Sequence, residues 1–138
     1  MSGMNSLLNY EPSWKASNTI APCTFVTIDP NFDEQVLQSV VGDMPIGVMW
    51  DGMRLTPGLA GSDNTIAAIS GDYGFRIIGL GNDCLIQLAG TVSPGNVLKP
   101  NGSGQAISGA VGDRYGAIAL QAGTSGVRIR CLVQRGVA

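Results

Sequence analysis

Turn-forming residues interrupt this chain every few positions, and this spacing decides what it can fold into. Glycine alone occupies 20 of the 138 positions, well above its average share of about 7%. The apolar stretches between the turns are short and rich in β-branched and aromatic residues, as in Thr24–Ile28, and such stretches favour strands. A stable helix needs a longer uninterrupted segment. The pattern therefore predicts an all-β protein.

The expected strands lie between the turn signals. Cys84–Ala89 is the clearest candidate for a central strand, and Met44–Trp50, which carries Pro45 and Gly47, is predicted as a short or edge strand. A single helical turn fits only at 33–40 or 63–69. In the last strand, apolar Val127, Ile129, Cys131 and Val133 alternate with other residues, which predicts one buried face. The further predicted strands are 24–28, 35–41, 65–70, 75–80, 96–98, 105–108, 116–121 and 127–134.

Residues 26–43 and 96–113 resemble each other when they are aligned without a gap. Pro-Asn, Gln and Val-Gly-Asp recur at equivalent positions of the two segments. This indicates either an internal duplication or the recurrence of turn residues in a chain with many hairpins. In both cases a unit of strand, turn, strand and Gly-Asp turn occurs twice. Two such units that close on each other make a small β-barrel or sandwich.

The first 18 residues differ from the rest of the chain because their apolar residues follow neither a helical nor a strand period. We therefore expect residues 1–18 to form an extended N-terminal arm and residues 19–138 to form the β-barrel domain. The apolar side chains of the arm are predicted to anchor it on a partner protein; they are Leu7, Leu8, Tyr10 and Trp14. The alternatives are a simple tail or an N-terminal strand of the same domain.

Charge and residue content argue against several classes of function. The chain has 8 basic and 10 acidic residues and no histidine. Because the basic residues are scattered, direct nucleic-acid binding is not expected. Without histidine the commonest general base and a common metal ligand are missing, so we expect no enzyme activity, no metal and no cofactor. No apolar run approaches the roughly 20 residues of a membrane span, so no membrane partner is expected.

The acidic and cysteine side chains are interpreted as structural rather than catalytic. Most Asp residues stand beside Gly, Pro or Asn, where the carboxylate usually bonds its own backbone in a turn. Cys23, Cys84 and Cys131 show no Cys-x-x-Cys spacing, and the N-terminus lacks the order of a signal peptide. We therefore expect a reducing cytoplasm and unreactive thiols buried in the core.

The stretch Leu88–Val133 resembles the C-terminal half of the capsid decoration, or cement, proteins of tailed bacteriophages. The matching pieces are Gly90-Thr91-Val92, Pro94-Gly95-Asn96, Val97-Leu98, Asn101–Gly104, Gly112-Asp113, Gly116–Leu120 and Gly126–Arg130. The resemblance implies a barrel of the β-tulip or β-clip type and no catalysis. It also implies trimers or dimers, with a homotrimer expected here, on the outer surface of the virion capsid, bound to the major capsid protein at junctions between its subunits.

A second hypothesis is a receptor- or carbohydrate-binding β-module of a virion fibre. Such modules present aromatic side chains on loops. After the arm, the loop aromatics of this chain are Trp50, Tyr73 and Tyr115. The two hypotheses are separated by whether the protein binds phage heads or glycans.

Overall fold

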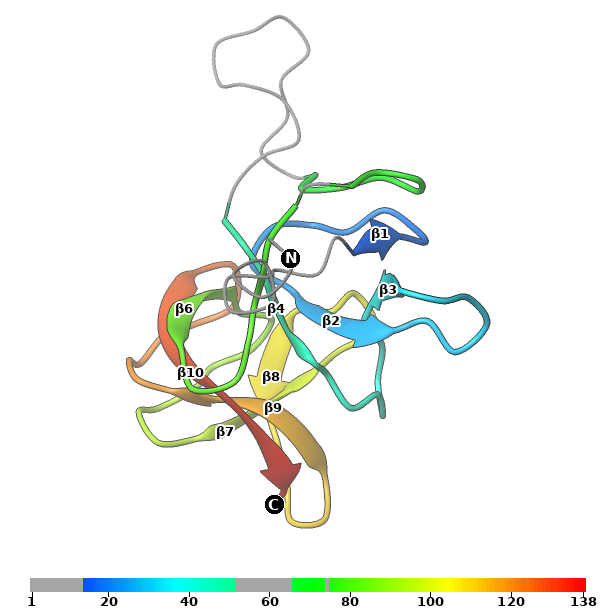
Figure 1. The fold of residues 1–138 in the computed structure, drawn as a ribbon. Coiled ribbons are helices and arrows are strands. Elements are labelled where there is room, and N and C mark those ends of the chain that lie inside the picture. Colours follow the sequence, from blue (N-terminus) through cyan, green and yellow to red (C-terminus); the bar gives the residue numbers. More distant parts are fainter. Residues whose placement is uncertain (1–13, 52–65, 74) are drawn as a thin grey trace, which may run out of the picture.

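The computed structural model describes residues 14–51, 66–73 and 75–138. Within these ranges the protein is all-β and contains no helix, as the sequence predicts. Two curled five-stranded sheets pack against each other (Figure 1). The strands are β1 (Lys15–Ala16), β2 (Phe25–Ile28), β3 (Gln35–Gln38), β4 (Gly47–Met49), β5 (Ile77–Ile78), β6 (Asp83–Gln87), β7 (Val97–Pro100), β8 (Ala106–Ser108), β9 (Arg114–Ala119) and β10 (Arg128–Val137).

The two sheets repeat one arrangement of four strands. The first sheet has the order β1-β3-β2-β4-β5 and the second β6-β10-β9-β7-β8. In the first, β2 pairs with β3 on one side and β4 on the other, and β4 pairs with β5. In the second, β7 pairs in the same way with β8 and β9, and β9 pairs with β10. All of these pairs are antiparallel. The unit that the sequence repeats is therefore present twice in the structure.

The repeated Val-Gly-Asp segments form the same turn. Gly42 has φ +88° and Gly112 has φ +91°, a conformation that glycine adopts without steric cost. The carboxylate of Asp43 accepts a hydrogen bond from the backbone N–H of Val40 at 3.0 Å, and that of Asp113 accepts one from Ala110 at 2.8 Å. This side-chain bond explains why Asp follows the glycine in both copies.

The described end of the predicted arm, residues 14–18, belongs to the first sheet. The backbone N–H of Lys15 donates to the Glu34 carbonyl at 3.1 Å, and that of Ala16 donates to the Asp72 carbonyl at 3.0 Å. β1 is thus bonded on both sides, in parallel register with β3 on one of them, and Ala16 has no exposed surface. For these residues the alternative of an N-terminal strand holds. A strand of two residues is too short to show a period in the sequence.

The larger core cluster joins the two sheets through Phe25. This side chain leaves β2, has no exposed surface, and packs among residues of the second sheet. It lies against Gly116 of β9, where a Cβ atom would stand 2.8 Å from Phe25 Cε1 and 2.8 Å from Pro45 Cγ. Gly116 therefore allows the two sheets to approach closely.

A second core cluster lies within the first sheet and includes Ile20, Met49 and Ala68. Ile20 and Ala68 form an isolated antiparallel bridge. This bridge stands in place of the strand expected at 65–70, of which residue 65 lies outside the described residues.

The strand predicted at 44–50 as short or at an edge is short, with three residues, whereas the strand predicted as central does not lie at the centre of its sheet. β4 lies inside the first sheet, because Pro45 precedes the strand and breaks no ladder bond within it. β6 lies at the edge of the second sheet rather than at its centre. An apolar strand fits at this edge because other segments of the chain cover it. Gln87 N–H donates to the Cys23 carbonyl, and Ala89 N–H, just after the strand, donates to the Ala106 carbonyl, both at 2.8 Å.

The alternation predicted for the last strand is present in β10. Ile129, Cys131 and Val133 are buried. Arg128 and Arg130, which alternate with them, are exposed. Val127 was expected on the same buried face, but it precedes the strand and is largely exposed. β10 therefore contributes one apolar face to the core and one charged face to the surface.

Candidate functional site

Of the four predicted anchors, Trp14 is the one that the structure describes; Leu7, Leu8 and Tyr10 lie outside the described residues. Trp14 is half-buried and packs against the second core cluster. Its side chain also lines a groove of about 380 Å³, together with Phe75, Arg76, Ile77, Ile78, Gly79, Asn82 and Asp83. Part of the Trp14 surface is thus used inside its own domain, and part faces this groove.

A second hollow of about 350 Å³ shares Ile78 and Asp83 with the first. Its other lining residues are Met49, Trp50, Asp51, Cys84, Leu85 and Arg130. The indole Nε1 of Trp50 is buried without a hydrogen-bond partner. A buried donor without an acceptor costs free energy. The hollow combines an aromatic ring, carboxylates and a guanidinium group.

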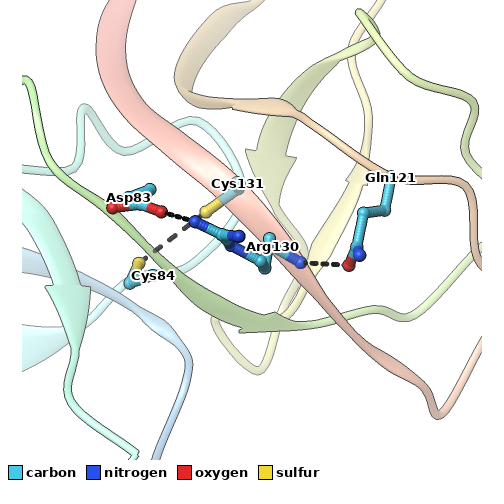
Figure 2. A network of polar contacts seen from close by, with 5 residues as sticks. All are labelled: Asp83, Cys84, Gln121, Arg130 and Cys131. Carbon is cyan, nitrogen blue, oxygen red and sulfur yellow. Dashed lines mark hydrogen bonds and ion pairs between the residues drawn. The ribbon is translucent and has the colours of Figure 1, made fainter.

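Arg130 is held at the rim of this hollow by a polar network on the outer face of the second sheet (Figure 2). Its guanidinium Nη2 donates to Asp83 Oδ2, and its backbone N–H donates to Gln121 Oε1 at 2.9 Å. The hydrogen bond from Arg130 lowers the pKa of Asp83, which keeps the carboxyl ionised. Because both side chains are about half exposed, the pair positions the guanidinium more than it stabilises the fold.

The three cysteines are free thiols in two environments. Cys23 is buried, and burial raises its pKa to about 11, as expected for an unreactive core thiol. Cys84 and Cys131 instead lie opposite each other on β6 and β10, with their Sγ atoms 3.8 Å apart. Figure 2 shows them beside Arg130. Nothing in the sequence indicates this pairing, since the two residues are far apart in the chain.

Four of the acidic residues predicted in turns bond the backbone of a turn, whereas Asp83, predicted in the same way, lies in β6 and pairs with Arg130, and Asp63 lies outside the described residues. Asp29 accepts a hydrogen bond from the backbone of Asn31 at 2.9 Å, and Asp72 accepts one from Ile69 at 3.1 Å, as Asp43 and Asp113 do in their own turns. Within residues 14–51, 66–73 and 75–138, no group of three or more His, Cys, Asp or Glu residues is placed to hold a metal ion. The same ranges contain no helix long and apolar enough to cross a membrane.

Valine side chains project from the tips of the two equivalent turns. Val41 is 64% exposed and Val111 is 96% exposed. The second turn lies beside the C-terminus, where Gly112 N–H donates to the Ala138 carbonyl at 2.8 Å and Val137 is also exposed. In Figure 1 this end of β9 and β10 is at the bottom of the view. The turn tips thus offer apolar contact surface outside the core.

Comparison with known proteins identifies a shared fold but no shared sequence. No family model matches the chain, and no curated protein matches its sequence. Among solved structures, the fold is similar to that of the crystal structure of the head fiber gp8.5 N base in bacteriophage phi29, with a TM-score of 0.63 and 10% sequence identity. The alignment covers 91% of this chain and 94% of that one. Nearly the whole chain therefore shares its fold with the base of a phage head fibre.

Proposed function

We propose that this chain is a structural, non-catalytic protein of the phage head, which decorates the outer surface of the assembled capsid. The observation that carries the proposal is the fold shared with a head fibre base over 91% of this chain. The resemblance of Leu88–Val133 to capsid decoration proteins points to the same place in the virion by an independent route. Both the fold and the turn motifs of that stretch lie in the described part of the chain.

In this proposal the protein acts as a cement. It binds the major capsid protein at junctions between subunits and adds contacts that resist their separation. As a homotrimer it would reach three capsid sites at once, and linked contacts dissociate far more slowly than single ones. Residues 1–13 carry three of the predicted anchors, Leu7, Leu8 and Tyr10, and would supply one set of these contacts.

The exposed turn tips are a second candidate contact. Val41 and Val111 occupy equivalent places in the two sheets and project into solvent. Burying a valine side chain fully against a partner contributes roughly 1.5–3 kcal/mol, and a trimer would multiply that contribution. The turns themselves are held by their Asp side chains, so little ordering is needed on binding.

The test is sedimentation of the purified protein with DNA-filled, expanded heads of the phage that encodes it. The proposal expects the protein to pellet with the heads and to raise the temperature at which they release DNA. Unexpanded proheads serve as the comparison shell. Heads that sediment without the protein and break at an unchanged temperature would rule out the cement function.

The hollow around Trp50 favours one other function, glycan binding by a fibre module. An aromatic ring beside carboxylates and a guanidinium suits a sugar. A glycan array tests this function, and Trp50→Ala removes the aromatic ring. Strong glycan binding by a protein that ignores heads would favour the fibre module over the cement.

A further inference from the structure

Two cysteines of the second sheet stand directly opposite each other. Cys84 on β6 is the register partner of Cys131 on β10. Along the same register, Leu88 N–H donates to the Val127 carbonyl at 2.9 Å. Hydrogen-bonded pairs recur at every second residue of an antiparallel ladder, so Cys84 and Cys131 also form a hydrogen-bonded pair, whose Cα atoms lie about 5.5 Å apart. This spacing falls within the roughly 4.4–6.8 Å that disulfides span.

The side chains are oriented for the same bond. Both thiols lie on the face of the sheet that meets the core, and their Sγ atoms are 3.8 Å apart (Figure 2). A disulfide bond is about 2.0 Å long. Because the backbone spacing already fits, the remaining gap can be closed by side-chain rotation.

Only one of the three thiols is open to a reagent. Cys84 is half-buried and lines the hollow that Arg130 borders, whereas Cys131 and Cys23 have no exposed surface. The hydrogen bond with Cys131 also lowers the pKa of Cys84, against the opposing effect of burial. A small disulfide compound in the hollow would therefore meet Cys84 first, and the lowered pKa favours its thiolate, which is the nucleophilic form.

We propose that Cys84 and Cys131 form an intramolecular disulfide when the protein meets a small-molecule disulfide such as oxidised glutathione. The Cys84 thiolate attacks one sulfur of the reagent, forming a mixed disulfide and releasing one glutathione thiolate. Cys131 then loses its proton and attacks the Cys84 sulfur, which releases the second glutathione. Two protein thiols lose two electrons, the reagent gains them, and the two protons end on the two glutathione thiols.

The first step removes an obstacle to the second. Before oxidation, the neighbouring Cys84 sulfur raises the pKa of Cys131, mainly through the hydrogen bond between them and also through burial. Once Cys84 is capped by glutathione, it carries no negative charge to oppose ionisation of Cys131. The buried thiol is then next to the sulfur that it must attack.

The place of this bond in the sheet gives it a consequence. It ties the edge strand β6 to β10 and closes a loop that contains β7, β8 and β9. The timing rests on the proposed function: a head protein is made in a reducing cytoplasm and meets an oxidising medium after lysis. The chemistry itself does not depend on that function, so a failure to bind heads would leave the disulfide proposal standing.

The experiment is peptide mapping of the wild-type protein after incubation with oxidised glutathione. Each cysteine falls in a different tryptic peptide; these are residues 16–54, 77–114 and 131–135. The second peptide extends to residue 114 because trypsin does not cleave between Lys99 and Pro100. We expect a linked species of 77–114 with 131–135 that disappears on reduction. A Tm increase of roughly 5–15 °C over the reduced protein should accompany it.

Variants separate the three thiols. Cys23→Ser is the matched control and should keep the linked peptides. Cys84→Ser should abolish them and leave Cys131 without glutathione, because no accessible thiol takes up the reagent. The proposal is overturned if wild-type Cys84 retains glutathione without linking to Cys131, if Cys23 enters the linked species, or if no cysteine reacts. The wild-type result decides even where a variant fails to fold.

Discussion

A methyl group added at Gly116 should push the two sheets apart where Phe25 and Pro45 pack against β9. The new Cβ would lie 2.8 Å from Phe25 Cε1 and 2.8 Å from Pro45 Cγ, far inside the 3.5–4.0 Å or so at which carbon atoms attract. Phe25 and Pro45 are both buried, so neither ring can swing into solvent. Gly116→Ala must therefore displace core side chains or the strand itself.

The expected cost follows from this overpacking. Extra methyl groups in a packed core destabilise by about 1–3 kcal/mol, and replacing glycine in a strand recovers about 0.5–1 kcal/mol of backbone entropy. The net loss should be roughly 0–2.5 kcal/mol, centred near 1 kcal/mol. For a chain of this size the central value corresponds to a fall in Tm of roughly 3–5 °C.

Thermal unfolding followed by circular dichroism measures this loss, with Gly102→Ala as the control. A Cβ at Gly102 would meet no atom within 4 Å, so that variant should melt close to wild type. In a Phe25→Leu background, which leaves room beside β9, Gly116→Ala should cost less than in the wild type. An equal cost in both backgrounds would refute the contact between Phe25 and Gly116.

Two further predictions concern the N-terminus of the chain and the second repeated turn. Deleting residues 1–13 should leave the melting curve nearly unchanged while weakening attachment to heads. Deleting residues 1–18 also removes β1 and should therefore lower Tm markedly. Equal melting curves for the two deletions would contradict the place of β1 in the sheet. The hydrogen bond from Lys99, at 2.7 Å, lowers the pKa of Asp113, so this pair stabilises the fold above the unfolded pKa near 3.9 and is lost as pH falls through the folded pKa. Asp113→Asn keeps a turn acceptor, as Asn96 does in its own turn. In urea unfolding it should be less stable than wild type near neutral pH, and this difference should shrink as pH falls through the folded pKa. A pH-independent difference would show that the charge pair contributes nothing.

Local features of the fold could be predicted from the sequence because their causes are local. The turn at Val41–Asp43 needs a positive φ and a short acceptor, and Gly42 and Asp43 supply both. The recurrence of these residues at 111–113 therefore predicted a second copy of the same unit. The buried face of β10 could be predicted for the same reason, since a half-buried strand shows its period in its own residues.

Features set by pairing between distant segments could not be predicted. β6 lies at the edge of its sheet, where Gln87 N–H donates to the Cys23 carbonyl from another part of the chain, and the residues of β6 alone do not show this arrangement. The two-residue strand β1 is defined by its pairing with β3 and not by a pattern in its own residues. The Cys84 and Cys131 pair and the hollow around Trp50 likewise exist only after the sheets have packed.

The most direct test of the proposed head function is the number of copies that a head can hold. DNA-filled heads are titrated with labelled protein, and the bound copies per head are counted after sedimentation. Attachment at capsid junctions predicts saturation at a fixed number that matches one class of lattice position, with trimers filling it in multiples of three. Binding that rises without saturation, or saturation unrelated to the lattice, would contradict the account.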